Sequence, residues 1–241
     1  MILGLKTARN NSLCKLNLRM DGADNGTIFT DSSPSGKTVT VINALTKTAT
    51  KKFGTASGYF NGSTAYLRLA DNADFESFTK ASFETWIYLT ALPSTVGTPF
   101  KLFDKDTGAS PNRQYTIQIH NSYPAANSFV LNFFDNTGGN KTYTYNGVVV
   151  VGELNTWIHF AIVLDLGSVP KLFKNGVSLT LTDSGGTNNG TLGTGNAPYL
   201  IGARIHSGTP AHFLNGYLDS AMFYKNMIKY KRSFTVPNRA A

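Results

Sequence analysis

The dipeptide Asn-Gly occurs six times in this chain of 241 residues, and its recurrence limits the fold more than any other feature. Asn and Gly tolerate positive φ angles, which the tight type I′ turn of a β-hairpin requires at both central positions. Several pairs border β-branched and aromatic runs, as in "KLFKNGVSLTL" and "FLNGYLDSAMFY". The chain therefore carries a repeated hairpin signature. The pairs begin at Asn25, Asn61, Asn146, Asn175, Asn189 and Asn215.

The segments between these turns also have strand character. The runs "SFETWIYL", "QYTIQIH", "FVLNFFD" and "TWIHFAIVLD" are rich in β-branched and aromatic residues. No stretch combines sustained helical periodicity with capping residues. We therefore expect an all-β fold, an antiparallel β-sandwich or jelly roll of many strands.

Composition excludes several classes of protein. Hydrophobic residues make up 41% of the chain and charged residues only 15%, which excludes disorder. Cys14 is the single cysteine, so no internal disulfide can form. The apolar run at residues 2–5 is too short for a signal peptide, and no run reaches membrane length. We expect a soluble protein made in the cytoplasm, with no membrane partner.

The chain is basic, with 22 Lys and Arg against 14 Asp and Glu and a net charge of +8. The positive charge is densest near the two ends, at residues 225–232 and in the series Lys6, Arg9, Lys15 and Arg19. Basic ends can dock on an acidic partner, or they can simply be solvated. No nucleic-acid-binding motif accompanies them, so we expect no nucleic-acid partner.

Six segments of the chain occur in a characteristic order: "KKFGTASGYFNGSTAYLRL", "ASFETWIYLT", "NTWIHFAIVLD", "KLFKNGV", "LIGAR" and "FLNGYLDSAMFY". This is the order found in laminin-G-like, concanavalin A-like jelly rolls, and each segment resembles its counterpart there. The ends of the domain, residues 20–41 and 223–238, resemble those of laminin-G-like domains in bacteriophage virion proteins. The resemblance implies a jelly roll over residues 51–241 with a basic closing segment. Residues 1–50 would supply an N-terminal arm and first strands, within one domain overall.

The resemblance also implies a function. It indicates a virion accessory protein, a capsid decoration or fibre subunit, that contacts other virion proteins through its basic termini. Such a protein could bind glycans of the host surface and form homo-oligomers. The alternatives are a free carbohydrate-binding or adhesion module and a glycoside hydrolase.

The acidic residues do not favour an enzyme. Glycoside hydrolases use two carboxylates that flank the scissile bond. Glu84 has no second acid two or four residues away, and Asp104 and Asp106 precede a glycine in a pattern typical of a turn. The four histidines lack metal-binding spacing. We predict no catalytic residues.

In β-sandwiches, sugars bind on strand faces and at loop tips through aromatic and polar side chains. In "ASFETWIYL", alternation places Phe83, Thr85 and Ile87 on one face and Glu84 on the other. In "RQYTIQIH", Tyr115, Ile117 and Ile119 alternate with the polar residues, and Tyr143 and Tyr145 precede an Asn-Gly turn. For each residue the alternative is an ordinary solvated position. The candidate ligand-binding residues are Glu84, Gln118, His120, Tyr143, Tyr145, Arg204 and His206.

The last candidate is a structural calcium site, which the related jelly rolls often hold beside their closing strand. Asp219 matches the acid of that strand, and Asp21 and Asp24 come from the appropriate end of the chain. No cofactor is required, and a buried, hydrogen-bonded Asp219 is the alternative. The apolar step from Leu218 to Ala221 breaks the strand period of two, which predicts a β-bulge at Asp219–Ser220.

Overall fold

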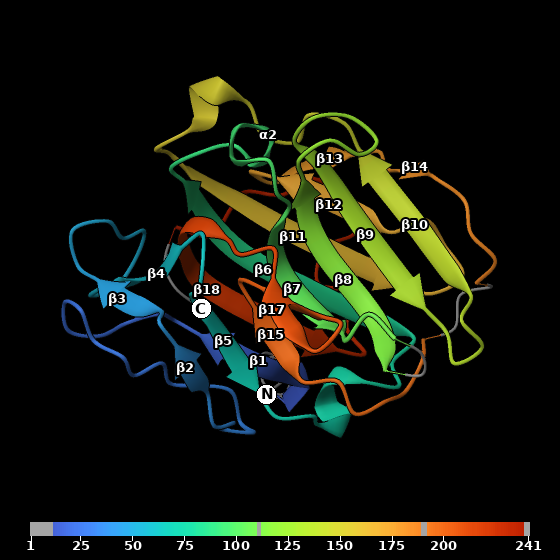
Figure 1. Cartoon of the computed structure of the whole chain (residues 1–241), viewed down its shortest axis with the longest axis horizontal. Coiled ribbons are helices and arrows are strands. Elements are labelled where there is room, and N and C mark those ends of the chain that lie inside the picture. The colour runs from blue at the N-terminus through green and yellow to red at the C-terminus, as the bar shows by residue number, and fades with distance from the viewer. Residues whose placement is uncertain (1–11, 110–111, 189–191, 239–241) are drawn as a thin grey trace, which may run out of the picture.

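A computed structural model describes residues 12–109, 112–188 and 192–238, which form two antiparallel sheets packed face to face (Figure 1). The basic residues Lys6 and Arg9 and the Asn-Gly pair at Asn189 lie outside the described residues. Sheet A has the strand order β13-β12-β11-β6-β18-β4-β3, and β1 also pairs with β18. Its strands are β1 (Cys14–Leu18), β3 (Leu45–Lys47), β4 (Ser57–Asn61), β6 (Lys80–Leu89), β11 (Trp157–Asp165), β12 (Lys171–Lys174), β13 (Val177–Leu179) and β18 (Asn215–Lys225).

Sheet B has the strand order β14-β10-β9-β8-β7-β15-β5-β2. A separate two-stranded hairpin follows β15 and consists of β16 (Arg204–His206) and β17 (Thr209–Ala211). The all-β sandwich expected from the sequence is confirmed. The strands of sheet B are β2 (Thr40–Ile42), β5 (Tyr66–Leu69), β7 (Phe100–Asp106), β8 (Arg113–His120), β9 (Ser128–Phe134), β10 (Asn140–Tyr145), β14 (Thr182–Asp183) and β15 (Tyr199–Ile201).

Apart from the helical residues Ser12 and Leu13, helical structure in the described residues consists of three short turns. They are α2 (Pro93–Val96) and two 3-10 turns, Ala73–Phe75 and Val151–Glu153. None of the helices in these ranges has the length and apolar character needed to cross a membrane.

One apolar core fills the space between the two sheets. On β6, Phe83 and Ile87 point into this core, and on β8, Tyr115, Ile117 and Ile119 do so. Because side chains alternate along a strand, Glu84 on β6 and Thr116 and Gln118 on β8 lie on the outer faces of the sheets. The strand faces predicted from the sequence are therefore correct for β6 and β8.

The N-terminal strands belong to both layers of the sandwich. β1 pairs with the second half of β18 and β3 pairs with β4, both in sheet A. β2 pairs with β5 at the edge of sheet B. These segments therefore extend both sheets.

The Asn-Gly pairs do not all form hairpin turns. Asn175 and Gly176, with φ angles of 48° and 78°, join the paired strands β12 and β13 as expected. Asn215 and Gly216 instead begin β18 and pair with residues of β4. The expectation of a turn at Asn215 is therefore wrong. The β18 residues Asn215 and Gly216 pair with Asn61 and Phe60, so long-range pairing overrides the local turn preference of the dipeptide.

The predicted bulge in β18 is present. The register against β6 shifts between Asp219 and Met222, and Ser220 has a φ of 52°. The extra residue allows Leu218, Ala221 and Phe223 all to face the core. This local distortion turns the Asp219 side chain toward the outer face of sheet A, where it meets the loop before β4.

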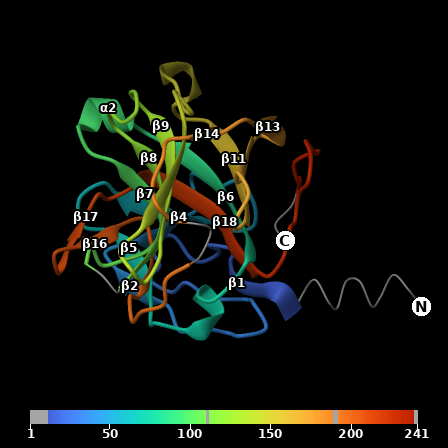
Figure 2. The same ribbon diagram turned by 90° about the vertical axis from the view of Figure 1, so that its right-hand side faces the viewer.

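Additional segments cover both outer faces of the sandwich. Figure 2 shows β16–β17 on one side and the C-terminal segment, residues 226–238, on the opposite side. The C-terminal segment packs Ile228, Tyr230 and Phe234 against an apolar patch of sheet A. Neither outer face of the sandwich is therefore an open sheet surface along its whole length.

Candidate functional site

Four of the predicted ligand residues come together at the outer face of sheet B. Gln118 and His120 lie on β8, and Arg204 and His206 lie on β16. The Arg204 guanidinium donates a 3.1 Å hydrogen bond to Asp106 Oδ2 on β7. This ion pair fastens the β16–β17 hairpin onto the sheet, so Arg204 has a structural role.

The charges beneath this hairpin are closed to solvent. Lys101 and Asp104, both on β7, are fully buried, and Lys101 Nζ lies 3.6 Å from Asp104 Oδ2. Burial lowers the pKa of Lys101 to about 8 and raises that of Asp104 to about 7. Asp104 and Asp106 thus belong to a strand and not to the expected turn. The charged groups beneath the hairpin thus form a buried polar cluster.

The two histidines at the edge of this cluster also have structural contacts. His120 Nδ1 accepts hydrogen bonds from the backbone N–H groups of Ser122 and Tyr123. The ring of His206 stacks on that of His212, with the centroids 6.4 Å apart. Burial is the main cause that lowers the pKa of His212 to about 4, and nearby positive charges add to it. The His212 imidazole is therefore neutral at pH 7.

Glu84 lies on the other sheet, apart from these residues. It occupies the outer face of sheet A, where the C-terminal segment covers it and leaves it 1% exposed. Its carboxylate lies 2.9 Å from His159 Nε2 and accepts hydrogen bonds from Lys229 Nζ and the Tyr230 hydroxyl. Burial alone would raise the pKa of Glu84, but His159 and Lys229 hold it below its usual range. The expected open binding position at Glu84 is therefore a closed ionic contact.

The three acids considered for calcium each accept hydrogen bonds from backbone amides. Asp219 Oδ2 accepts from the N–H groups of Lys52 and Phe53, both at 3.0 Å. Asp21 binds the N–H of Thr55, and Asp24 binds that of Thr48. Within the described ranges, no group of three or more His, Cys, Asp or Glu residues could hold a metal ion. The carboxylates therefore anchor loops, and these contacts do not build a calcium cage; calcium binding stays a prediction.

Tyr143 and Tyr145 were expected at an exposed loop tip, but the structure places both within a strand. Both lie on β10 and pair with Leu131 and Phe129 of β9, which face the core. Tyr143 is 7% exposed. Its burial raises its pKa above the usual range, and the nearby Asp183 charge adds a smaller increase. Its ring nevertheless reaches a pocket at the end of the sandwich, so Tyr143 remains a candidate.

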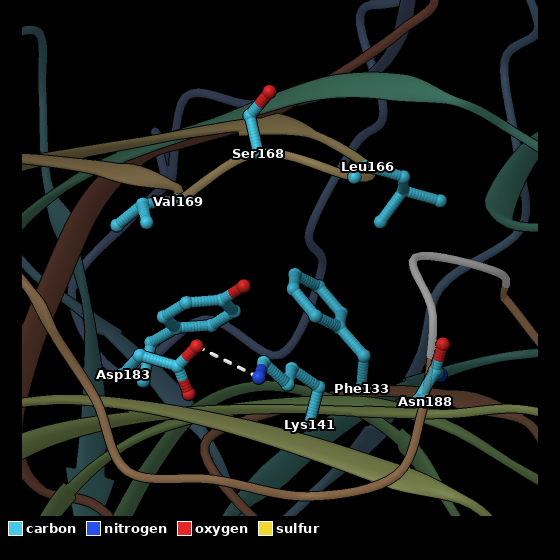
Figure 3. A pocket seen from close by; sticks show the side chains of 9 residues that line it. Phe133, Lys141, Leu166, Ser168, Val169, Asp183 and Asn188 are labelled. Carbon is cyan, nitrogen blue, oxygen red and sulfur yellow. Dashed lines mark ion pairs between the residues drawn. The ribbon is translucent and has the colours of Figure 1, made fainter.

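This pocket, called the β10 pocket, has a volume of about 340 Å³. In Figure 3 the turn at residues 166–169 lies on one side of the pocket, and the side chains from β9, β10 and β14 lie on the other. Its volume falls within the range of small-ligand sites. The residues that line it are Phe133, Lys141, Tyr143, Leu166, Gly167, Ser168, Val169, Asp183 and Asn188.

An ion pair and two aromatic rings define the chemistry of the β10 pocket. Tyr143 pairs with Asp183 across β10 and β14, and Lys141 Nζ lies 2.7 Å from Asp183 Oδ2. The hydrogen bond between them raises the pKa of Lys141 and lowers that of Asp183. The rings of Phe133 and Tyr143 meet edge to face at 6.3 Å. The pocket thus combines an apolar wall with a fixed donor and a fixed acceptor.

The loop after β14 closes one rim of the β10 pocket. Thr142 donates its N–H to Gly185 O, and Asn188 donates its N–H to Asn140 O, which holds the loop against β10. Gly186 has a φ of 118°, and a Cβ there would lie 2.1 Å from Asn140 O. Only glycine allows this approach of the two backbones.

The sequence alone did not identify most of this pocket. Lys141 and Asp183 are distant in the chain and meet only because β14 pairs with β10. Of the residues that line the pocket, the sequence named Tyr143 alone, as one of two tyrosines expected at an exposed tip before an Asn-Gly turn.

Comparison with protein families gives one match. Residues 61–229, more than half of the chain, match the family model described as the concanavalin A-like lectin/glucanases superfamily. No curated protein sequence matches the chain.

Solved structures share the fold at low identity. The chain is similar to the binding domain of Paraclostridial Mosquitocidal Protein 1, with 13% identity and a TM-score of 0.66 over 91% of this chain and 50% of that one. It is also similar to the botulinum neurotoxin serotype D ligand binding domain in complex with N-acetylneuraminic acid. There the identity is 13% and the TM-score 0.62, over 96% of this chain and 50% of that one. The chain thus spans about half the length of these solved chains, and the likeness shows the fold.

Proposed function

The chain belongs to the concanavalin A-like lectin/glucanases superfamily, and from this premise we propose that it is a non-enzymatic carbohydrate-binding module. The observation that carries the proposal is the β10 pocket, where aromatic rings lie beside the Lys141–Asp183 ion pair. The complex of a solved structural relative with N-acetylneuraminic acid gives the proposal further support.

The chemistry of the β10 pocket suits a sugar ring. The C–H face of a sugar packs on aromatic and aliphatic side chains, here Phe133, Tyr143 and Val169. Sugar hydroxyls both donate and accept hydrogen bonds, so they can bind the Asp183 carboxylate and the Lys141 ammonium. The ion pair fixes both groups before the ligand arrives, which reduces the entropy lost on binding.

The β10 pocket does not favour glycoside hydrolysis. That reaction needs two carboxylates around the scissile bond. Asp183 is the single carboxylate among the residues that line the pocket. We therefore expect no product release from any polysaccharide that the protein binds.

A glycan array followed by calorimetry tests the proposal. The wild type should bind at least one glycan. The Lys141→Ala/Asp183→Ala variant should bind that glycan about tenfold more weakly, a loss of about 1.4 kcal/mol in binding free energy. The double substitution leaves the net charge unchanged. A matched control is Lys174→Ala/Glu153→Ala, which removes another partly exposed ion pair and should bind as the wild type does. Equal binding by all three proteins would refute the assignment of the site.

For the biological setting, we propose that the module is an accessory protein of a bacteriophage particle. Support comes from the resemblance of residues 20–41 and 223–238 to the ends of such virion domains. The basic termini would contact other virion proteins, and repeated copies would sit on symmetric positions of the particle. The protein should then sediment with intact particles. Its recovery only from the soluble fraction of the lysate would contradict this role.

A further inference from the structure

A second pocket adjoins the β10 pocket, on the outer face of sheet A. This basic pocket has a volume of about 320 Å³. Ser168 and Val169 line both pockets, so the turn at residues 166–169 separates them. The two pockets are therefore neighbours. The residues that line the basic pocket are Lys80, Val163, Asp165, Ser168, Val169, Lys171, Ile228 and Lys231.

Three lysines from separate parts of the chain converge on the basic pocket. Lys80 comes from β6, Lys171 from β12 and Lys231 from the C-terminal segment. Within the described part of the chain, none of them forms an ion pair with a carboxylate. Lys171 Nζ donates a 2.8 Å hydrogen bond to Lys231 O, which holds the C-terminal segment at the pocket.

The lining of the basic pocket is positively charged and partly apolar. Asp165 is the single carboxylate among its lining residues, against three ammonium groups. Val163 and Ile228 provide apolar surface inside it. Val169 is 52% exposed at the boundary with the β10 pocket. A ligand with both an anionic group and a C–H surface would match this combination.

We propose that the two pockets together bind an acidic oligosaccharide that passes over the turn at residues 166–169. One sugar ring would occupy the β10 pocket beside Tyr143. The neighbouring sugar would place a carboxylate or sulfate among Lys80, Lys171 and Lys231. The inference rests on the proposed carbohydrate-binding function and specifies its ligand class.

The charge distribution favours a sugar over a long polyanion such as a nucleic acid. The positive charge of the basic pocket is confined to three lysines, and the adjoining β10 pocket contains the Asp183 carboxylate. A nucleic acid presents phosphates along its whole length and requires an extended basic surface. An oligosaccharide with one acidic unit needs only this local charge.

The test uses an array of matched oligosaccharides in neutral, sialylated, uronic-acid and sulfated forms. Calorimetry then compares the best acidic binder with its neutral counterpart. The Lys80→Ala/Lys231→Ala variant should lose about tenfold in affinity for the acidic form and retain its affinity for the neutral form, since two ionic contacts are removed. Affinity for the acidic form should also fall as salt is raised, because these lysines are exposed.

The matched control is Lys47→Ala/Lys51→Ala, which removes the same charge near β3, at the opposite edge of sheet A. It should bind both forms as the wild type does. Equal wild-type affinity for acidic and neutral forms would overturn this inference while the proposed function stands. Equal binding of a short DNA duplex and the acidic glycan would also overturn it. Absence of binding to every glycan would refute the proposed function itself.

Discussion

Replacement of Asp219 by alanine should destabilise the fold without affecting sugar binding. Asp219 is fully buried at the bulge in β18, and its carboxylate accepts the N–H groups of Lys52 and Phe53. The substitution leaves both donors without their acceptor. A fully buried group that loses its partner costs about 1–3 kcal/mol, and these part-buried amides lie at the low end of that range. Removal of a buried charge offsets part of this cost at neutral pH. We therefore expect a net loss of about 2 kcal/mol at pH 7.5.

The loss should be larger in acid. Burial raises the pKa of Asp219 from 3.8 to about 6, so the folded state binds its proton more tightly than the unfolded state does. The resulting stability is fully present below pH 4 and disappears as the pH rises through 6. Linkage gives about 1.4 kcal/mol of this stability at pH 5, which the alanine variant lacks. The difference between the two proteins should therefore grow to about 3.4 kcal/mol at pH 5.

Calorimetric unfolding at pH 7.5 and pH 5 measures this effect. For a domain of this size, 1 kcal/mol corresponds to about 2–4 °C in Tm. The variant should melt about 4–8 °C below the wild type at pH 7.5, and about 7–14 °C below it at pH 5. Asp24→Ala is the control, because Asp24 lies in an exposed loop. A wild-type Tm in the Asp219 variant, or a difference that shrinks in acid, would refute this account of the bulge.

Three further outcomes follow from the same contacts. Glu84→Gln should cost about 3 kcal/mol, because the Lys229 ammonium loses the buried carboxylate that it pairs with. Trypsin should then cleave the loosened C-terminal segment faster than in the wild type. Gly186→Ala should weaken glycan binding in calorimetry by displacing the rim of the β10 pocket from Asn140, while a wild-type affinity would show that the rim is not needed. A chelator should leave the Tm unchanged, since backbone amides donate to the carboxylates of Asp21, Asp24 and Asp219; a clear loss of Tm would establish a structural calcium ion.

Local patterns were sufficient to predict β6 and β8 and the core-facing side of each. Alternation along β6 and β8 indicates which side chains enter the core, because that pattern depends only on neighbouring residues. The break in alternation at Asp219 likewise predicted a bulge that the structure contains. The partners of the Asp219 carboxylate were not predictable, because residues 52 and 53 are remote in sequence.

Long-range packing decides the positions that the sequence predicted incorrectly. Glu84 resembles an open polar strand position until the C-terminal segment covers it. Asn215 begins a strand because it pairs with Asn61 in β4. Lys141 and Asp183 form one site only through the pairing of β10 with β14. Each of these contacts joins distant segments, so a local pattern contains no signal for them.

The most direct test of the carbohydrate-binding account is an NMR titration of the isotope-labelled protein with the best glycan from the array. Backbone amide shifts should change on β10, on β14 and in the turn at residues 166–169, which surround the β10 pocket. The amides of the β16–β17 hairpin should stay unchanged, because the face beneath it is closed. Shift changes confined to that hairpin, or none at saturating glycan, would contradict the account.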